Sequence, residues 1–579
     1  MANYSVREEL GKEANKELAA YPELLRKLLY YRGIKTAKDA ETFLNPVFEE
    51  NNDPFLMHGM DKAAERILEA IEKEEKIVIY SDYDSDGIPG AVVLHDFFQK
   101  IGYKNFENYI PHRVLEGFGL NDEAVEEFSK KGVSLIITVD CGIADVAEAE
   151  VIKKLGIDLI ITDHHLPTIV KDKENLPHAV AILDHKQKAC KYPDKNLCGS
   201  GVIFKLVQGL IKKHGKKWGI MDGWEKWLLD MVAIATVSDM VPLVGENRLL
   251  AYYGLKVLRK SPRAGLQRLL QIVKIDQKNI TEDDIGFMIS PRINAASRMG
   301  KPEDAFNLLT TKDETEALKY ATHLNKINDE RKGIVSGMVK EIRKHWSVFD
   351  PEKKRKVLVA GNPDWKPSLL GLVANSLMDE HDGPVFLWGR EEGKTLKGSC
   401  RSDGYIDIVE MMRDSSHLLV EYGGHSASGG FSISLEKVDL LADGLEVSYV
   451  RLASKSREQS EAAYVVDSAL SLDDVNAETE KEISKLAPFG VGNPKPIFAF
   501  RDIEIANVKI FGKKGEHLKI DFENKRGHTI SAIGFFKKPS DFSAEVIKGG
   551  KITLLANLEK SFFGGRTELR LRIVDIFKF

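Results

Sequence analysis

The sequence predicts a multidomain α/β protein built on a parallel sheet, followed by a second α/β lobe and a small β-barrel. The chain has 579 residues, which is too many for one hydrophobic core. Apolar runs alternate with amphipathic segments from residue 76 to residue 184, a pattern typical of βαβ units. A second alternating region begins at Lys356, and short alternating segments divided by turns follow Pro494.

The parallel sheet is predicted from five apolar runs and three amphipathic connections. Strands are expected at 76–80, 108–111, 135–140, 159–163 and 179–184, and helices at 91–100, 122–130 and 144–155. Pro89 suits the first turn of the first helix, where a missing N–H leaves no hydrogen bond unmade. Right-handed crossovers between these strands would give a parallel sheet.

The rest of the chain divides into segments of different composition. Residues 4–52 and 201–309 are expected to be mostly helical. Asp313–Trp346 has few breakers and mixes charged and apolar residues at helical spacing, as a helix connecting two lobes would. The expected division is an N-terminal helical cap (1–52), a first α/β domain (53–312), a connecting helix (313–347), a second α/β domain (348–452), and a linker with the barrel (453–579).

Charge and cysteine content narrow the class of protein. The net charge is −5, yet residues 500–579 carry 16 Lys and Arg against 10 Asp and Glu, which leaves −11 for the rest. A basic terminal module suits nucleic-acid binding, although a basic surface without function would have the same composition. The N-terminus is polar, no apolar stretch is long enough to span a bilayer, and the four cysteines match no disulfide framework. A cytoplasmic protein is therefore expected.

Acidic and imidazole side chains stand at the ends of three predicted strands. Asp82-Tyr-Asp-Ser-Asp-Gly87 follows the first strand, Asp140 ends the third, and Asp163-His-His165 follows the fourth. The carboxyl ends of parallel strands share one edge of the sheet, which is where ligands bind. Carboxylates gathered there repel one another unless a cation holds them, so the pattern predicts a divalent metal site.

Two hard divalent cations suit these donors. Carboxylate oxygens bind Mg²⁺ and Mn²⁺, and Mn²⁺ also accepts imidazole nitrogen. Asp140 would bridge two ions, His164 would ligate one, and Asp239, which follows an apolar helical run, would complete the set. Two such ions about 3.5–4 Å apart stabilise the attacking and leaving oxygens of a phosphoryl displacement.

Each of these side chains also has an ordinary structural interpretation. A single strand-end aspartate is more often a helix N-cap, and Asp84, Asp163 and Asp184 are open to that interpretation. A histidine pair is more often a core or surface feature. The coincidence of three such patterns on separate strands favours the metal site.

These motifs and several later ones resemble those of a known family. Asp82–Gly87, Asp140, Asp163–His165 and Asp239 are similar to the successive motifs of the DHH phosphoesterases. Later segments resemble the RecJ family within that superfamily, the bacterial single-strand-specific 5′→3′ DNA exonucleases. These segments are Arg292–Gly300, Gly398–Ser402, Gly423–Gly430 and Pro488–Pro494. The resemblance covers nearly the whole chain. It implies a parallel-sheet DHH domain, a long helix, a smaller α/β DHHA1 domain and an OB-fold barrel, in that order.

The resemblance also assigns roles at the metal site. It implies two Mn²⁺ or Mg²⁺ ions, with metal ligation by Asp84, Asp86, Asp140, His164 and Asp239. His165 would act at the scissile phosphate, and Asp82 would support the ligands.

Further residues would bind nucleic acid. By resemblance, Arg113, Ser399 and Arg401 would hold the 5′-terminal phosphate, Arg298 would hold the DNA backbone, and His425 would face the site from the second lobe. Arginine binds phosphate through a planar fork, although a surface salt bridge for Arg298 and a tight turn for Gly423–Gly430 are equally simple interpretations. Barrel candidates for base stacking and backbone contact are Phe511, Lys513, Lys514, Lys519, Phe562 and Arg566.

The sequence departs from the family pattern at two places. Ile88-Pro89 stands where relatives usually have Thr or Ser soon after the motif glycine. Trp365-Lys-Pro-Ser368 stands where they commonly have Trp-His-x-Gly. The missing histidine puts the contacts of that loop in doubt, and Lys366 would be the replacement phosphate contact.

The expected function is that of a metal-dependent exonuclease that threads single-stranded DNA between two lobes and releases 5′ mononucleotides in DNA recombination and repair. One alternative is a DHH phosphodiesterase for short oligonucleotides or cyclic dinucleotides, which the basic barrel opposes. Another is a non-catalytic DNA-binding scaffold, which the complete set of carboxylates opposes. The expected partners are a single strand with a 5′ end, a helicase and a single-strand-binding protein, with no membrane, and the chain is expected to be a monomer.

Overall fold

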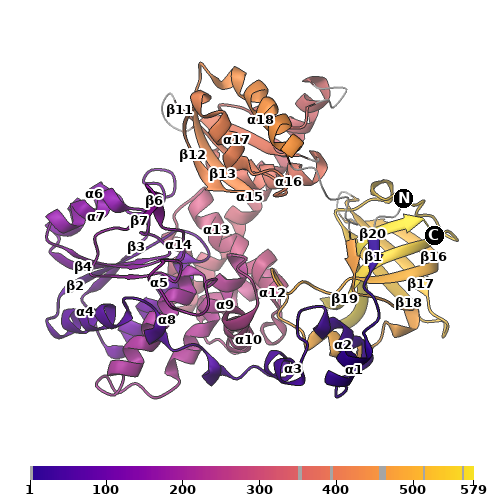
Figure 1. The fold of residues 1–579 in the computed structure, drawn as a ribbon, viewed down its shortest axis with the longest axis horizontal. Helices are drawn as coiled ribbons and strands as arrows, with labels where there is room; N and C mark the ends of the chain where they lie inside the picture. Colours follow the sequence, from indigo (N-terminus) through magenta and orange to yellow (C-terminus); the bar gives the residue numbers. More distant parts are fainter. Residues whose placement is uncertain are drawn as a thin grey trace. The chain divides into compact units, whose positions relative to one another are not determined.

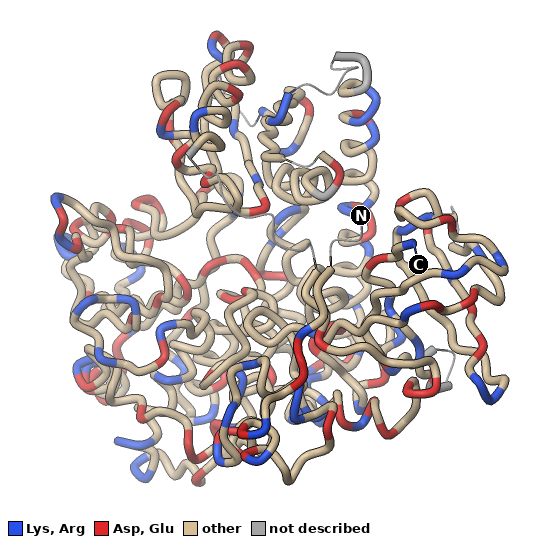
Figure 2. The backbone as a smooth tube through the Cα atoms, turned by 45° about the vertical axis from the view of Figure 1, so that its right-hand side comes forward, with Lys and Arg blue, Asp and Glu red and all other residues tan. Residues whose placement is uncertain are grey.

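The computed structural model describes residues 4–349, 355–381, 383–390, 395–455, 464–512, 515–563 and 566–578. The chain forms two compact units, and both are discontinuous in sequence. One unit comprises Met1–Asp53, Met240–Lys256 and Ser460–Phe579, and the other comprises Pro54–Asp239 and Val257–Gln459. Basic and acidic residues are interspersed along both units (Figure 2). Among the described residues, no helix has the length and apolar character needed to cross a membrane.

A five-stranded parallel sheet forms the centre of the second unit, as the sequence predicts. Its order is β3-β2-β4-β5-β8, and every neighbouring pair is parallel. The strands are β2 (Lys76–Ser81), β3 (Phe106–Tyr109), β4 (Val133–Val139), β5 (Asp158–Thr162) and β8 (Ala181–Leu183). Helices cover both faces, which is why the central strands are continuous runs of Ile, Val and Leu. Figure 1 shows α6 (Asp122–Lys130) and α7 (Val146–Lys154) on one face, opposite α4 (Met60–Glu72), α5 (Gly87–Ile101) and α8 (Gly199–His214).

Close packing holds the start of α5 against the strand ends. A Cβ added at Gly87 would lie 2.5 Å from the carbonyl oxygen of Asp82, and one at Gly90 would lie 2.6 Å from Cγ1 of Val139. Ile88 is fully buried and Pro89 lies in the first turn, so this departure from the family pattern belongs to the core. The loop between β2 and α5 is therefore fixed from both ends.

Helices follow the sheet, and one of them is long. A short hairpin of β6 (Thr168–Val170) and β7 (Lys173–Asn175) lies between β5 and β8. The helices after the sheet are α9 (Leu229–Ser238), α11 (Ala264–Val273), α12 (Glu282–Asp284), α13 (Ser290–Met299) and α14 (Glu303–Thr310). A π-helical turn at Ile285–Ile289 directly precedes α13. Helix α15 (Glu314–Phe349) then runs for 36 residues into the second α/β region.

The second α/β region has its own five-stranded sheet, in the order β12-β13-β11-β10-β9. Its strands are β9 (Leu358–Gly361), β10 (Val385–Arg390), β11 (Thr395–Arg401), β12 (Leu419–His425) and β13 (Ser428–Ser434), and its helices are α16 (Pro367–His381), α17 (Ile408–Asp414) and α18 (Leu441–Lys455). Phe386, Leu396 and Ile433 from this sheet pack with Met411 of α17 and Leu445 of α18 in one buried cluster.

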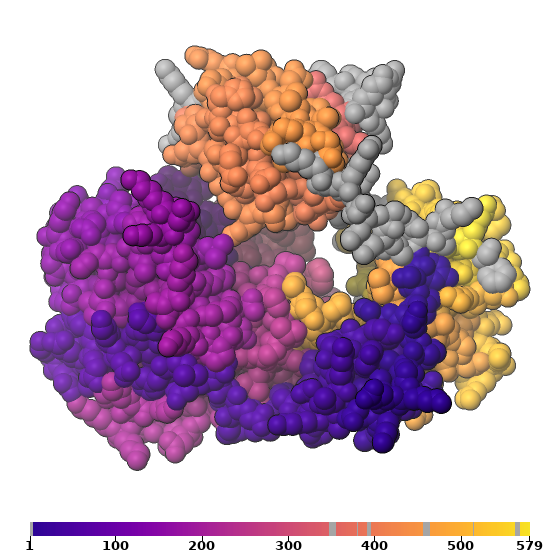
Figure 3. Space-filling model, viewed as in Figure 1, coloured from indigo at the N-terminus to yellow at the C-terminus, as the bar shows by residue number. Residues whose placement is uncertain are grey.

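The first unit is a β-barrel packed against N-terminal helices. β16 (Phe498–Phe511) pairs with both β17 and β19, and this closes the sheet. The other elements are β17 (His517–Glu523), β18 (Thr529–Phe535), β19 (Lys551–Phe563), β20 (Arg566–Lys578), β1 (Tyr4–Val6), β14 (Tyr464–Val466), β15 (Ser468–Ala469), α1 (Lys12–Glu17), α2 (Glu23–Tyr30), α3 (Ala37–Leu44), α10 (Gly245–Leu258) and α19 (Ala477–Ser484). Leu25 and Leu28 of α2 share one core with Phe498 and Phe500 of the barrel. Figure 3 accordingly shows the indigo N-terminal residues lying against the yellow C-terminal ones.

The segment Pro488–Pro494 is a structural joint of this unit. Asn493 is 1% exposed, and its amide donates hydrogen bonds of 2.8 Å to the carbonyl oxygens of Leu486 and Pro488. Arg32 Nε donates to Asn493 Oδ1 at 2.9 Å, and Arg248 Nη1 donates to the Leu486 carbonyl at 2.8 Å. The motif that helped to identify the family therefore holds α2, α10 and the barrel linker together.

This joint makes a testable contribution to stability. Asn493→Ala removes two buried hydrogen bonds to the carbonyl groups of Leu486 and Pro488 and the bond from Arg32 Nε, so it should lower the free energy of unfolding by about 1–3 kcal/mol. Thermal unfolding followed by circular dichroism measures the change. Asn507→Ala is the matched control, because Asn507 is exposed and makes one long 3.3 Å contact. Equal melting temperatures for the two variants would contradict the structural role of Asn493.

Candidate metal and phosphate site

The first aspartate motif is held in place by backbone amides. Asp84 Oδ1 accepts the N–H groups of Asp86 at 2.7 Å and of Gly87 at 3.2 Å, so Asp84 does cap the start of α5. The Asp86 carboxylate accepts the N–H groups of Gly199 and Ser200, each at 2.7 Å. The positive end of the α8 dipole therefore faces Asp86. Each carboxylate is fixed by two hydrogen bonds from backbone N–H groups and retains free lone pairs.

Asp140 is held in a strained conformation at the end of β4. Its φ is +64°, in the left-handed region that non-glycine residues seldom adopt. Gly199 makes room for it, because an added Cβ there would lie 2.5 Å from Asp140 Cβ. Asp140 Oδ1 and Asp82 Oδ1 are both buried without a hydrogen-bond partner. Such oxygens are costly in a dry interior unless a cation binds them.

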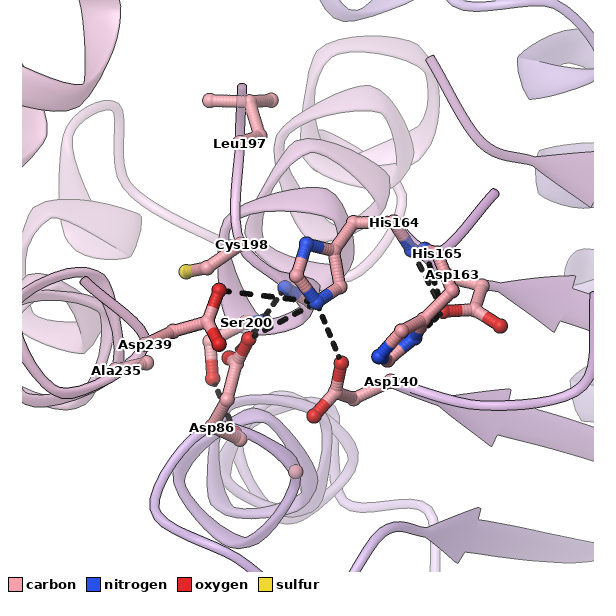
Figure 4. Close-up of polar contacts among 12 residues, drawn as sticks. Asp86, Asp140, Asp163, His164, His165, Leu197, Cys198, Ser200, Ala235 and Asp239 are labelled. Atoms are coloured by element: carbon pink, nitrogen blue, oxygen red, sulfur yellow. Dashed lines mark hydrogen bonds and ion pairs between the residues drawn. The ribbon is translucent and has the colours of Figure 1, made fainter. Parts of the chain in front are cut away.

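The adjacent histidines have different partners (Figure 4). His164 Nε2 lies 3.1 Å from Asp140 Oδ1, and 3.8 Å from Oδ2 of both Asp86 and Asp239. His165 Nδ1 lies 2.7 Å from Asp163 Oδ1. His164 therefore faces the carboxylates, whereas His165 is oriented by Asp163.

Asp163 has a structural role, in agreement with one of the two interpretations left open by the sequence. Its Oδ1 accepts the backbone N–H groups of His164 and His165 at 2.7 and 3.1 Å, and its Oδ2 accepts that of Ile143 at 3.0 Å. These bonds, with the His165 ring, occupy both carboxylate oxygens. Asp163 thus fixes the histidine pair and is absent from the groups able to hold a cation among the described residues.

Burial shifts the pKa values of the site strongly. Burial and the neighbouring carboxylates raise the pKa of Asp86 to about 6 and that of Asp239 to about 8, and they raise the pKa values of Asp82 and Asp140 well above the usual range. Burial lowers the pKa of His164 to about 3, so its ring is neutral and able to ligate a cation. Burial opposes the charged form of His165, but the hydrogen bond and charge of Asp163 raise its pKa to about 9.

The donor atoms fall into groups of the size a cation needs. The ligand atoms within 4.8 Å of one another belong to Asp86, His164 and Asp239, to Asp82, Asp84 and Asp140, and to Asp140, His164 and His165. Oxygen-rich groups with one or two imidazoles fit Mn²⁺ or Mg²⁺. Asp82, expected only to support the ligands, lies in a group together with two of them. His165, expected to act at the phosphate, likewise lies in a group with Asp140 and His164.

Four arginines gather beside the carboxylates. The Arg113 guanidinium lies over the Tyr83 ring, 4.7 Å from its centroid. Its positive charge contributes to lowering the pKa values of Arg298 and Arg401. Burial, followed by the charges of Arg113 and Arg331, lowers the pKa of Arg298 to about 9. Such mutual repulsion indicates a site for a strongly anionic group. Arg331 of α15 belongs to this cluster, and the sequence does not reveal it because one arginine on a long charged helix carries no signal.

Arg298 also links the two α/β regions of the second unit. Its Nη1 donates to the carbonyl oxygen of Ser368 at 2.6 Å, and Ser368 Oγ donates to the Arg298 carbonyl at 3.1 Å. The loop that departs from the family pattern at Trp365–Ser368 is therefore in contact with α13. Lys366, the expected replacement for the histidine, is exposed.

The remaining phosphate candidates lie in the second sheet. Arg401 Nη1 donates to Ser399 Oγ at 3.1 Å, so these two side chains form one unit. His425 is exposed at the end of β12, where it pairs with Ser428 of β13, and its side chain makes no hydrogen bond or ion pair with any other described residue. The structure therefore brings together Arg113, Arg298, Ser399 and Arg401, and the sheet register places His425 in the same cross-strand row as Arg401, with Ser428 between them.

Two further residues near the site escaped the sequence analysis. Asn294 of α13 accepts the Ser85 N–H at 3.0 Å and donates to Ser85 Oγ at 2.9 Å, which clamps the loop between Asp84 and Asp86. Phe118 is 50% exposed and packs edge-on against the His165 ring at 5.5 Å. The sequence offers one indication of this residue, because Phe118 stands between two glycines. Both Gly117 and Gly119 have positive φ in the structure.

The barrel has an aromatic and basic surface of its own. The His517 ring packs against Phe511, Phe535 and Phe536 with centroids 4.9–5.2 Å apart, and Arg572 lies 4.1 Å over Phe535. Of the expected contacts, Phe511 lies in this cluster, whereas Lys519 pairs with Asp521 at 3.3 Å. Lys513, Lys514 and the side chains of Phe562 and Arg566 lie outside the described part of the chain.

Three family models match the chain in order. They are the DHH family N-terminal domain over residues 76–236, the DHHA1 domain over 354–447 and the RecJ OB domain over 466–575. Among curated relatives, the single-stranded-DNA-specific exonuclease RecJ of Bacillus subtilis is 34% identical and the alignment covers 95% of this chain and 67% of the relative. The Escherichia coli protein of the same name is 29% identical, with 96% of each chain covered.

Solved structures agree with these matches. RecJ in complex with Mn²⁺ from Thermus thermophilus superposes with a TM-score of 0.79 at 26% identity, covering 100% of this chain and 79% of that one. Exonuclease RecJ bound to manganese superposes with a TM-score of 0.59 at 30% identity, covering 70% and 97%. Motifs, domain order, identity and fold agree, and the chain belongs to the RecJ family of DHH proteins.

Proposed function

We propose that the protein is a metal-dependent exonuclease that digests single-stranded DNA from its 5′ end and releases 5′ mononucleotides. The observation that carries the proposal is the juxtaposition of metal-compatible carboxylate groups with a half-buried arginine cluster. The first suits phosphodiester hydrolysis, and the second suits capture of a phosphate. The names and metals of the similar proteins support the same activity.

The residues present fit two divalent cations. Asp86, His164 and Asp239 would hold one ion, and Asp82 and Asp84 with a bridging Asp140 would hold the other. When bound, such ions supply Lewis-acid stabilisation of the charge on a reacting phosphate and an activated water. The neutral His164 ring and the buried Asp82 Oδ1, which has no hydrogen-bond partner, are the features of this chain that favour the assignment.

His165 is suited to hold a positive charge beside the reacting phosphate. The Asp163 hydrogen bond at Nδ1 fixes the ring and keeps it protonated at neutral pH. Its other nitrogen, Nε2, is then a donor available to a phosphate oxygen. Asp163 orients His165 and stabilises its charge, and Phe118 offers an aromatic face next to it.

The arginine cluster supports the 5′ polarity. Arg113, Arg401 and Ser399 would hold the terminal phosphate, with Arg298 and Arg331 adding positive charge. A terminal phosphate carries more negative charge than a diester, so a pocket of several arginines favours a chain end over an internal position. The barrel surface around His517 and Phe535 would bind the strand through stacking and cations.

The proposal also covers the cellular role, partners and oligomeric state of the enzyme. We expect roles in DNA recombination and repair with a helicase and a single-strand-binding protein as partners, a monomeric state, and the domain boundaries expected from the sequence. The four cysteines are buried free thiols, which supports a reducing cytoplasm. A phosphodiesterase for dinucleotides would need neither the barrel surface nor the OB-type domain, which favours the exonuclease.

The central test is digestion of end-labelled single-stranded and duplex DNA with Mn²⁺ or with EDTA. The wild type should degrade single strands from the 5′ end only with metal, and His164→Ala should be at least roughly 100-fold slower, since a ligand to the cation is lost. His178→Ala is the control, because His178 is an exposed histidine in the same domain. Release of label first from the 3′ end would contradict the proposed polarity.

Metal binding should depend on pH in a defined direction. The raised pKa values of Asp86 (about 6) and Asp239 (about 8) favour the protonated carboxyl groups in the folded metal-free protein. That protein should therefore lose stability as the pH rises from about 4, the unfolded value, through 8. Mn²⁺ must displace these protons, so it should raise the melting temperature more above pH 8 than near pH 6. A shift equal at both values would refute the assignment of these carboxylates as ligands.

The 5′-phosphate pocket has its own test. Arg401→Ala should reduce the preference for 5′-phosphorylated over 5′-hydroxyl strands by roughly 10-fold or more, because a charge-assisted hydrogen bond to the phosphate is lost. The ratio of kcat/KM for the two substrates measures this preference. Arg413→Ala, at an exposed arginine in the same domain, should leave the ratio unchanged. A preference retained in the Arg401 variant would place the phosphate elsewhere.

A further inference from the structure

The loop between β3 and α6, residues 110–121, contacts the candidate site at two points. In its first half, the Arg113 guanidinium lies over the ring of Tyr83, the residue inside the first aspartate motif, 4.7 Å from the ring centroid. In its second half, the Phe118 ring packs edge-on against the His165 ring, with centroids 5.5 Å apart. The path of this loop therefore decides where both side chains stand beside the site.

Glu116 lies between these two contacts, and its carboxylate binds both ends of the loop. Its Oε1 accepts hydrogen bonds from the hydroxyl group of Tyr109 and, at 3.1 Å, from the side-chain amide of Asn121. Its Oε2 accepts the backbone N–H of His112 at 2.6 Å. Tyr109 is the last residue of β3, and Asn121 caps the start of α6. One half-buried carboxylate thus ties the end of the strand to the start of the helix.

The first half of the loop has few other restraints. Within the described part of the chain, residues 112–115 make hydrogen bonds only with one another and with Glu116. The second half is fixed independently, because the buried Tyr80 hydroxyl donates to the Gly119 carbonyl at 2.8 Å. Glu116 is therefore the hydrogen-bonded link between the segment that carries Arg113 and the elements on either side of it.

We propose that Glu116 is a positioning residue of the 5′-phosphate pocket, because it holds the loop in the path that places the Arg113 guanidinium beside the first aspartate motif, ready to bind the terminal phosphate. The inference rests on the proposed exonuclease function. A guanidinium fork binds phosphate well only when it is aligned with the oxygens, and one held in place beforehand loses less conformational entropy on binding. Glu116 acts through Arg113 and belongs to none of the groups able to hold a cation among the described residues.

The first experiment compares Glu116→Ala with Glu126→Ala on single strands that carry a 5′ phosphate or a 5′ hydroxyl, in Mn²⁺. Glu116→Ala should lower the ratio of kcat/KM for the two substrates by roughly 10-fold, as expected when a charge-assisted hydrogen bond to the phosphate is lost. Activity on 5′-hydroxyl strands should fall much less. Glu126 is an exposed glutamate of α6 whose side chain makes no hydrogen bond or ion pair with any described residue, so its variant should leave the ratio unchanged.

Two conservative variants test the hydrogen bonds themselves. The donors to Glu116 are all neutral, so Glu116→Gln keeps an acceptor oxygen for Tyr109 and Asn121 and should retain most of the preference for the 5′ phosphate. Tyr109→Phe removes one donor but keeps the ring, which packs against Phe128 with centroids 5.1 Å apart. It should lower the substrate ratio by less than Glu116→Ala does. Added to Glu116→Ala, it should have no further effect on the ratio, because both changes remove the same hydrogen bond.

A second background separates positioning from general stability. In Arg113→Ala, the added Glu116→Ala substitution should leave the substrate ratio unchanged, because Glu116 acts through a guanidinium that is already absent. The rise in melting temperature caused by Mn²⁺ should be the same in Glu116→Ala as in the wild type, since no candidate ligand is changed. A ratio that falls again in the Arg113→Ala background would overturn the inference. So would a Glu116→Ala variant that melts at a lower temperature but keeps the wild-type ratio.

The outcomes also distinguish this inference from the proposed function. A wild type that prefers 5′-phosphorylated single strands, together with the same preference in Glu116→Ala, would overturn the role of Glu116 alone. A wild type that digests both substrates equally well would also overturn that role, while the metal-dependent nuclease activity itself would stand. A wild type without metal-dependent nuclease activity would overturn the proposed function and, with it, this inference.

Discussion

Mutual repulsion among carboxylates at one sheet edge is the constraint around which this fold is organised. Asp82, Asp86 and Asp140 are buried close together, and their pKa values are raised as a result. The protein opposes this repulsion locally: the amides at the start of α8 hold Asp86, and the turn before α5 holds Asp84. The glycines at 87 and 199 allow the necessary close approach. The site is thus a strained anionic pocket for which a divalent cation is the natural counterpart.

Residues from separate elements have different roles around this pocket. Asp163 uses all of its hydrogen-bonding capacity on the histidine pair and the neighbouring backbone, which lets one imidazole remain neutral while its neighbour is charged. Asn294 fixes the aspartate loop from the helical region, and Arg298 connects that region to the second sheet. The positive charges come from elements far apart in the sequence, which is why their role depends on the tertiary fold.

The sequence predicted the parallel sheet because its strands are long apolar runs, and it predicted the strand-end acids because polar residues interrupt those runs abruptly. The long helix and the closed barrel were also confirmed. Arg331 and Asn294 could not be found in this way, since each is an ordinary polar residue on a helix and gains its meaning only from what lies across the fold. The structural role of Asn493 was hidden for the opposite reason: its motif carried a family resemblance that drew attention to function.

The chain path at Asp239 has a structural consequence. Asp239 is the last residue of its stretch in the catalytic unit, and Met240, which has a φ of +57°, is the first residue of the stretch that belongs to the barrel unit. A covalent bond therefore joins a candidate metal ligand to the body that carries the aromatic, basic surface. The boundary between the two units thus falls directly beside a candidate metal ligand, with no intervening residue.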